Sequence, residues 1–358
     1  MVIHKAREWI SSQSLLKLLA MIVGAGAVLG VLVPLLLVAT QRWTEVRARR
    51  VHQAPGRIID AGGLGMHLAC AGLAEPGEAV VVVDADVASF SLDWVAIQDR
   101  LVEEGIRSCL YDRTGYGWSE VGGGSRTAEG AALELHTLLG ASGEPGPYVI
   151  VGHGLGALNA QVYAALFPGE TAGLVLVHPL TEVVLGEAYS RGWERRLDIY
   201  ERLRGLTASG LLRVVRPFVK SVNPPWVDEM PAGTREAYLA LLLDRAFYET
   251  AIAEITGMAT SFDQVKTALR GELPLGGLPL VVLTAARSAA PDATPFDLEM
   301  VATGDDVVVA HRAIAALSVR GERRMLGQSG PRVQFDAPDA VVAATRDMVA
   351  MARVVSDD

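Results

Sequence analysis

Cysteine is scarce in this chain, with only Cys70 and Cys109 among 358 residues. Both lie in short apolar runs with the composition of β-strands, and we interpret them as small, buried hydrophobic side chains. Two cysteines provide neither a framework of several disulfides nor the ligand spacing of a zinc site. We therefore predict neither a bound metal nor a cofactor.

Positive charge is scarce outside the N-terminus. The formal net charge of the chain is −9, although residues 1–50 contain seven basic and only two acidic side chains. The net charge is therefore +5 in this segment and −14 over residues 51–358. An acidic globular part disfavours contact with a phosphate backbone, so we expect no nucleic-acid partner.

Charge is absent from one long segment. Leu18 to Thr40 comprises 23 uncharged residues, enough for a helix to cross a hydrocarbon core of ~30 Å. A cleaved signal peptide fits less well, because its apolar region is usually ~7–15 residues long and no A-x-A site follows here. A buried helix of a soluble domain also fits less well, because a terminal helix that is apolar on every face has nothing around it to bury it. We predict a short basic tail (1–17), one transmembrane helix (18–40) and a linker (41–55).

Two features of this segment concern its orientation and its contacts. Basic residues flank it on both sides and are slightly more numerous after it, so the positive-inside rule favours a cytoplasmic globular part in a single-pass membrane protein. Gly26 and Gly30 form a G-x-x-x-G, which lets two membrane helices approach closely and would support a homodimer or another protein partner. Glycine is also common in membrane helices without that role, so both interpretations stay open.

After residue 55, short apolar runs alternate with helical segments. Strands are expected at 57–60, 66–70, 79–83, 106–111, 148–151, 173–177, 278–284 and 332–335. This alternation predicts βαβ units in a mostly parallel sheet, formed by residues 56–179 and 273–358. Residues 180–272 are rich in amphipathic helical patterns, and we predict that they form a helical cap over the carboxyl edge of the sheet.

Serine is missing from the most informative motif of the chain. Residues 148–158 combine a β-branched strand, a tight turn and the start of a helix, which is the layout of the nucleophile elbow G-x-S-x-G. The five residues here are Gly152, His153, Gly154, Leu155 and Gly156. Both flanking glycines are present, but glycine also stands at the nucleophile position, where it adopts a strained backbone without a Cβ penalty.

Four segments together carry a family resemblance. They are YDRTGYGWS (111–119), PYVIVGH (147–153), GLVLVHP (173–179) and SGPRVQFDAP (329–338). As a set they resemble the α/β-hydrolase family over about residues 55–350. The resemblance implies an α/β-hydrolase fold and a catalytic serine, acid and histidine in that chain order. It places the serine at Gly154 and the histidine at Pro331, and neither residue can perform the required chemistry.

Few other residues could replace the missing catalytic groups. The resemblance places the acid at His178 or after the following strand, where the chain reads Ala285, Ala286, Arg287 and Ser288, with Asp292 further on. His311 is the last of seven histidines, and we expect it on the surface at the start of a helix. We interpret His153 as a packed or hydrogen-bonding residue under the pocket. A metal site formed by His153 and His178 is less well supported, because it would lack matching carboxylate or thiolate ligands.

The loop expected to form the oxyanion hole also departs from the family pattern. Residues 84–90 (DADVASF) contain no glycine. The carboxylates of Asp84 and Asp86 would repel an oxyanion there, although Asp84 could instead cap a helix or turn. The residues expected to line a ligand pocket are Asp86, Val87, His153, Gly154, Leu155 and His178.

These departures suggest a membrane-anchored pseudo-hydrolase that has lost serine chemistry. It would act by binding a small apolar ligand or a protein partner, for example as an accessory subunit of a membrane complex. The alternative is an active hydrolase or lyase of the same fold, in which His153 or His178 activates a water molecule. The loss of nucleophile and base favours a protein that is not an enzyme.

Overall fold

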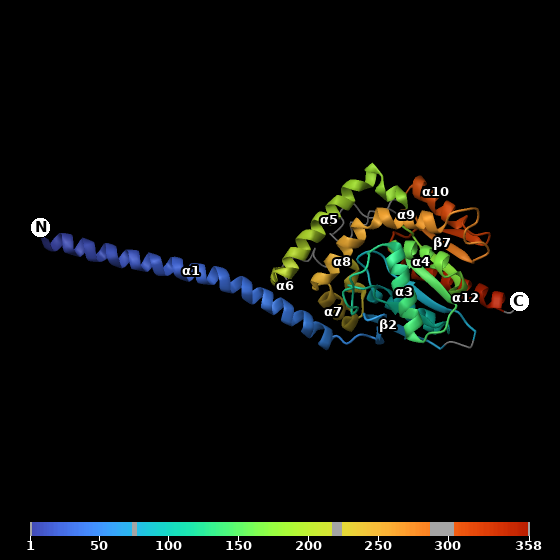
Figure 1. The fold of residues 1–358 in the computed structure, drawn as a ribbon, viewed down its shortest axis with the longest axis horizontal. Helices are drawn as coiled ribbons and strands as arrows, with labels where there is room; N and C mark the ends of the chain where they lie inside the picture. Colours follow the sequence, from blue (N-terminus) through green and yellow to red (C-terminus); the bar gives the residue numbers. More distant parts are fainter. Residues whose placement is uncertain (1, 74–76, 217–223, 287–303, 357–358) are drawn as a thin grey trace.

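The computed structural model describes residues 2–73, 77–216, 224–286 and 304–356. The chain begins with one helix of 50 residues, α1 (Val2–Val51), which projects from a globular body (Figure 1). Its part from Lys17 to Val51 is long and apolar enough to cross a membrane, with a mean hydropathy of 2.6 in the most apolar window. None of that window is buried, unlike a core helix of a soluble protein, while a signal sequence near the N-terminus passes the same test of length and hydropathy.

The described residues of the globular body form an eight-stranded sheet in the order β1-β2-β4-β3-β5-β6-β7-β8. β1 pairs with β2 and β2 with β4 in antiparallel fashion, and all other neighbours are parallel. The predicted mostly parallel sheet is thus confirmed. The strands are β1 (Arg57–Asp60), β2 (Gly65–Ala71), β3 (Val80–Asp84), β4 (Ser108–Tyr111), β5 (Tyr148–His153), β6 (Thr171–Val177), β7 (Leu280–Ala285) and β8 (Gly321–Leu326).

Helices cover both faces of the sheet, which explains why its central strands are apolar on both sides. Along β3, Val80 and Val82 face the core shared with α3 (Ala128–Ser142), α4 (Leu155–Leu166) and α10 (Asp305–Ala315). Val81 and Val83 face the opposite core, shared with α2 (Val95–Glu103) and α12 (Pro338–Ser356). The strand alternation therefore divides one sheet between two hydrophobic cores.

The described chain between β6 and β7 is helical. After a short 3₁₀ helix (Glu182–Leu185) come α5 (Glu187–Ala208), α6 (Leu211–Val215), a 3₁₀ helix (Pro225–Glu229), α7 (Ala232–Leu241), α8 (Arg245–Thr256) and α9 (Met258–Ala268). α8 lies against α5, while α9 packs on α3 and α4. We call this unit the cap.

Two expectations about secondary structure were wrong. Residues 41–51 of the expected linker continue α1, and Gln41 is buried because it donates to the Leu243 carbonyl (2.7 Å). Residues 332–335, expected as a strand, lie mostly in the short helix α11 (Val333–Asp336). The last strand is instead β8, whose sequence GERRML is charged because it lies at the edge of the sheet.

The two cysteines form a disulfide, which their interpretation as small, buried hydrophobic side chains did not include; Cys109 is buried as expected and Cys70 is partly buried. Cys70 of β2 and Cys109 of β4 lie directly opposite each other in antiparallel strands, with a Cα–Cα distance of 4.0 Å. The two residues are 39 positions apart in the chain. Their proximity depends on which strands pair, and the local sequence around each cysteine does not contain that information.

Candidate functional site

The turn between β5 and α4 has the shape of a nucleophile elbow without its nucleophile. Gly154 has φ 53° and ψ −111°, a strained conformation that glycine adopts readily. Its amide donates to the Val177 carbonyl (3.1 Å), which fixes the turn against the end of β6. The elbow has therefore kept its backbone geometry although no side chain projects from it.

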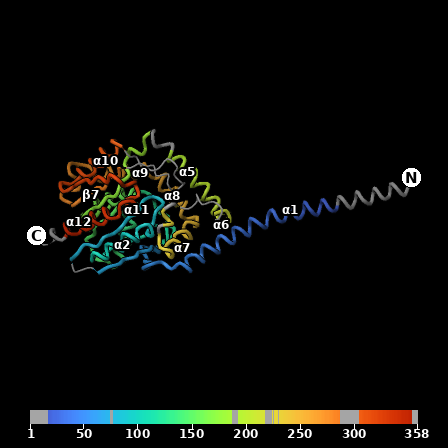
Figure 2. The backbone as a smooth tube through the Cα atoms, turned by 180° about the vertical axis from the view of Figure 1, so that it is seen from behind, coloured from blue at the N-terminus to red at the C-terminus, as the bar shows by residue number. Residues whose placement is uncertain are grey.

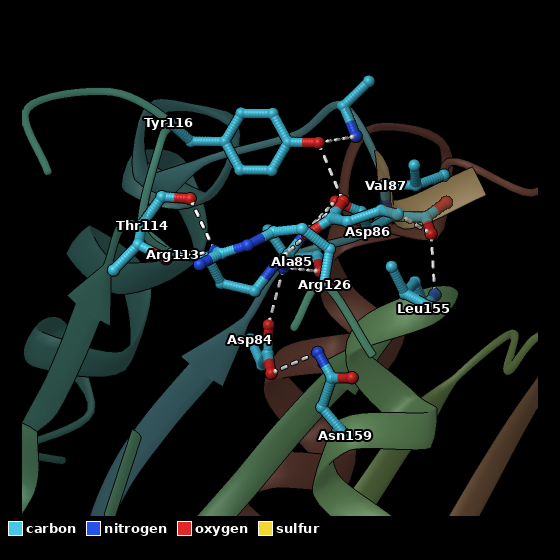
Figure 3. Close-up of polar contacts among 12 residues, drawn as sticks. Asp84, Ala85, Asp86, Val87, Arg113, Thr114, Tyr116, Arg126, Leu155 and Asn159 are labelled. Atoms are coloured by element: carbon cyan, nitrogen blue, oxygen red, sulfur yellow. Dashed lines mark hydrogen bonds and ion pairs between the residues drawn. The ribbon is translucent and has the colours of Figure 1, made fainter. Parts of the chain in front are cut away.

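The Asp86 carboxylate fills the space that a side chain at position 154 would need. A Cβ atom placed on Gly154 would overlap Asp86 Cγ and both carboxylate oxygens. Asp86 Oδ1 accepts a hydrogen bond from the Leu155 amide (2.7 Å) and another from the Val87 amide (2.7 Å) (Figure 3). The carboxylate is thus fixed by two charge-assisted hydrogen bonds, one from the elbow and one from the loop after β3.

Arg113 determines the course of the loop that carries Asp86. Its guanidinium forms ion pairs with Asp84 and with Glu254 of α8, each at 2.7 Å, and all three side chains are almost completely buried. It also donates to the carbonyls of Ala85 (2.5 Å) and Asp86 (2.8 Å) (Figure 3). Burial alone would lower the pKa of Arg113, but the carboxylates of Glu254 and Asp84 raise it well above its usual value. The guanidinium is therefore charged and links sheet, loop and cap.

The expectation that Asp84 caps a helix or turn was wrong. Besides Arg113, its carboxylate accepts from Asn159 Nδ2 of α4 (3.0 Å). Tyr116 extends the network, since its hydroxyl donates to Glu254 (2.7 Å) and accepts from the Ala88 amide (3.1 Å). A buried carboxylate needs such partners to offset its lost hydration.

His153 contacts the loop that contains Pro331. Its Nε2 donates to the Pro331 carbonyl (3.1 Å), so Nε2 carries a proton. Nδ1 is buried and has no hydrogen-bond partner among the residues that the structure describes. The ring lies edge-on to Trp94, with 5.7 Å between centroids.

His178 and His311 form a buried pair near the carboxyl ends of β6 and β7. His178 has φ 42°, and its Nδ1 accepts from the Ala285 amide (3.1 Å). His311 Nε2 donates to the Pro179 carbonyl (2.8 Å), which leaves Nδ1 to accept from the Thr284 hydroxyl (3.0 Å). Burial lowers the pKa of His178, with smaller contributions from His311 and His153, and lowers that of His311 to about 4.

The expected surface position of His311 was therefore wrong. The residue is fully buried because α10 packs against β7 and turns this face inward. Of the positions considered for the acid, Ala285 ends β7 and Ala286 follows it, and neither has an ionisable side chain. Arg287, Ser288 and Asp292 lie outside the described residues.

The cavity above Asp86 is small and polar. It has a volume of about 30 Å³ and is lined by Asp86, Val87 and His153, together with Arg196 and Tyr200 of α5, Trp226 and Arg332. The Arg332 guanidinium stacks on the Trp226 ring at 3.4 Å. Pockets for small organic ligands usually measure ~300–1,000 Å³, so this cavity suits one or two water molecules. Of the expected pocket residues, Gly154, Leu155 and His178 do not line it.

Comparison with known proteins identifies the family. A family model described as "Alpha/beta hydrolase family" matches residues 85–344, which is well over half of the chain. The chain belongs to the α/β hydrolase family. This confirms the predicted family and fold.

Solved α/β hydrolases have the same fold at low sequence identity. An esterase from Thermogutta terrifontis is 20% identical, covering 81% of this chain and 94% of its own, with a TM-score of 0.57. A protein described as a putative lipase from Acinetobacter baumannii is 15% identical, covering 88% and 97%, with a TM-score of 0.61. An uncharacterized protein of Schizosaccharomyces pombe is 33% identical over 122 residues. That match spans 31% of this chain and about a fifth (22%) of the relative.

The family's elbow geometry explains the two hydrogen bonds to Asp86. In α/β hydrolases, the oxyanion hole consists of the amide after the nucleophile and an amide from the loop after β3. Leu155 follows the nucleophile position and Val87 lies in the loop after β3, and both amides donate to Asp86. We expected this carboxylate to repel an oxyanion from a nearby position. The structure instead places it between the Leu155 and Val87 amides, a position that sequence reasoning missed because it depends on the empty space at Gly154.

Proposed function

We propose that this protein is a membrane-anchored α/β hydrolase homologue that has lost serine hydrolysis and acts by binding. The observation that carries the proposal is the Asp86 carboxylate, which accepts from the Leu155 and Val87 amides. Acyl transfer needs these donors for the negative oxygen of the tetrahedral intermediate. A fixed carboxylate excludes that oxygen by both its volume and its charge.

The state of the triad positions supports the same proposal. Gly154 offers no hydroxyl, and Pro331 offers no side-chain proton acceptor. The Pro331 carbonyl instead accepts a hydrogen bond from His153 Nε2. Removal of triad members typically lowers turnover by about 10⁶, because the triad functions as a unit.

The cavity above Asp86 does not suit a small apolar ligand. Its volume of about 30 Å³ and its arginine side chains are unsuited to an apolar molecule. The Gly26 and Gly30 face of α1 is open, since a Cβ on either residue would meet nothing within 4 Å. This open face supports a role as an accessory subunit or homodimer assembled through α1.

The alternative function is an active enzyme in which His153 or His178 activates water. One observation favours it, namely that His153 Nδ1 has a lone pair with no partner among the described residues. His153 Nδ1 is buried, however. His178 is a weak base, because its pKa is lowered. The experiment below separates the two functions.

The test uses the full chain in detergent, a fluorophosphonate probe and short acyl esters. We expect no labelling and no hydrolysis with the native chain, and none with Gly154→Ser/Pro331→His, because Asp86 still occupies the hole. Adding Asp86→Gly should permit labelling by opening the space that the serine side chain needs. Ester hydrolysis by the native chain that disappears in His153→Asn or His178→Asn would establish the alternative function.

A further inference from the structure

The cap exposes a cluster of apolar side chains at one place. Leu206 near the end of α5 and Leu211, Val214 and Val215 of α6 are 36%, 40%, 51% and 38% exposed. Single exposed hydrophobic residues are normal on a protein surface. Four within ten residues form a patch of the kind that marks an interaction surface. We call these four residues the α6 patch.

The α6 patch lies beside the apolar part of α1. Gly210, which connects α5 to α6, has φ 76° and approaches so closely that a Cβ there would overlap the Leu37 carbonyl oxygen. Arg213 Nε donates to Gln41 Oε1 (2.7 Å). Figures 1 and 2 show α6 next to α1 from opposite sides. The patch is therefore level with residues 37–41, where the uncharged segment of α1 ends.

Residues just beyond this level have the character of a membrane interface. Trp43 is 59% exposed, and the Arg47 guanidinium stacks on its ring at 5.0 Å. Tryptophan and arginine are typical of the boundary between headgroups and acyl chains. With a rise of 1.5 Å per residue, Leu37 lies about 9 Å closer to the bilayer centre than Trp43. This is the depth at which interfacial helices bury their apolar faces.

The direction of α1 relative to the cap is fixed by several contacts. Arg49 pairs with Asp244 of the cap (2.9 Å), and Gln41 donates to the Leu243 carbonyl. The chain after α1 is attached to the core as well, since Trp118 Nε1 donates to the His52 carbonyl (2.8 Å). A membrane that surrounds α1 up to residue 37 would therefore meet the α6 patch.

We propose that the α6 patch is a second membrane contact, inserted into the acyl boundary of the same bilayer that α1 crosses. The proposal rests on the proposed membrane anchoring by α1. Its partner is the lipid surface. The globular body would then contact the membrane at two places, through α1 and through the α6 patch. α5 connects the patch, which includes its Leu206, to the cavity, which its Arg196 and Tyr200 line.

The test measures quenching of a fluorophore by lipids with a nitroxide on the acyl chain. The full chain carries an environment-sensitive label at Val31→Cys, Val214→Cys or Val309→Cys and is reconstituted into phosphatidylcholine and phosphatidylglycerol nanodiscs. Val31 reports on α1, Val214 on the patch and Val309, which is 62% exposed on α10, on a surface of the core. Leu211→Cys provides a second position in the patch, and the thermal unfolding of each variant is compared with that of the native chain.

We expect at least twofold quenching at Val31, Val214 and Leu211, and none at Val309. Quenching at Val31 without quenching in the patch would refute the second contact but leave the anchor intact. No quenching at Val31 would refute the anchor and, with it, the second contact. A patch label that is shielded from water but not quenched by lipid would indicate a second copy or another protein on the patch and would also refute the proposal.

Discussion

The substitution Gly154→Ala tests whether Asp86 and a side chain at position 154 exclude each other. The added Cβ would overlap the carboxylate, and residue 154 has φ 53° and ψ −111°. The strained backbone alone costs about 1–3 kcal/mol in a residue other than glycine. Displacing Asp86 from the Leu155 and Val87 amides removes two hydrogen bonds to a charged group, each worth about 1.5–3 kcal/mol. We expect the free energy of unfolding to fall by at least about 4 kcal/mol in total.

A double-mutant cycle isolates the part that is due to Asp86. In an Asp86→Ala background, Gly154→Ala meets no carboxylate and costs only the backbone strain. The expected coupling energy between the two positions is therefore about 3 kcal/mol, as is usual for residues in direct contact. The four proteins are compared by denaturant unfolding in detergent, followed by the fluorescence of the buried Trp94 and Trp118.

Asp86→Asn is the matched control, since its amide has the shape of the carboxylate and can still accept from a backbone amide. In that background the cost of Gly154→Ala should lie between its values in the native and the Asp86→Ala backgrounds, because the overlap remains but hydrogen bonds to a neutral acceptor are weaker. Additive effects of Gly154→Ala and Asp86→Ala, with a coupling below about 0.5 kcal/mol, would mean that the carboxylate does not occupy this position.

Three further predictions concern other parts of the molecule. Arg113→Ala leaves Asp84 and Glu254 buried without their countercharge and should lower the free energy of unfolding by about 3–5 kcal/mol, whereas Arg202→Ala at the exposed pair with Asp198 should cost less than about 1 kcal/mol. Equal losses in denaturant unfolding would refute this. His178 and His311 have lowered pKa values in the folded chain, so the unfolded chain binds more protons between pH of about 4 and 6.5, and stability should fall as the pH drops through this window. If His311→Gln leaves the slope of melting temperature against pH unchanged, the two histidines are not the cause of the pH dependence. The Cys70–Cys109 bond predicts that the denatured, unreduced chain has no thiol to alkylate and that the globular part faces an oxidising compartment, whereas the basic residues that flank the apolar segment favour the cytoplasmic side. Free thiols in protein taken directly from cells would support the cytoplasmic side.

The elbow and the sheet could be predicted from the sequence because their signals are local. A β-branched run followed by G-x-G-x-G specifies a strand, a turn and a helix within eleven residues, and the structure has all three at Tyr148–Leu158. The same is true of the uncharged segment that became part of α1.

The misjudged features depend on contacts between distant parts of the chain. Asp86 and Leu155 are 69 residues apart, and the space between them exists only because residue 154 has no side chain. The disulfide depends on the pairing of β2 with β4. The side of α10 that carries His311 depends on the packing of that helix against β7, since an amphipathic pattern indicates a buried face but not what covers it.

The contacts of Arg113 make the position of the cap and the state of the oxyanion hole thermodynamically linked. One guanidinium joins Glu254 of α8 to the Ala85 and Asp86 carbonyls, so a displacement of α8 must pull on the loop that carries the Asp86 carboxylate or break a buried ion pair. Any partner that binds a raised cap more tightly would therefore weaken the hold of the Leu155 and Val87 amides on Asp86. By the same reciprocity, an anion that displaces Asp86 would favour that partner. The state of the Asp86 carboxylate would in this way depend on the position of the cap.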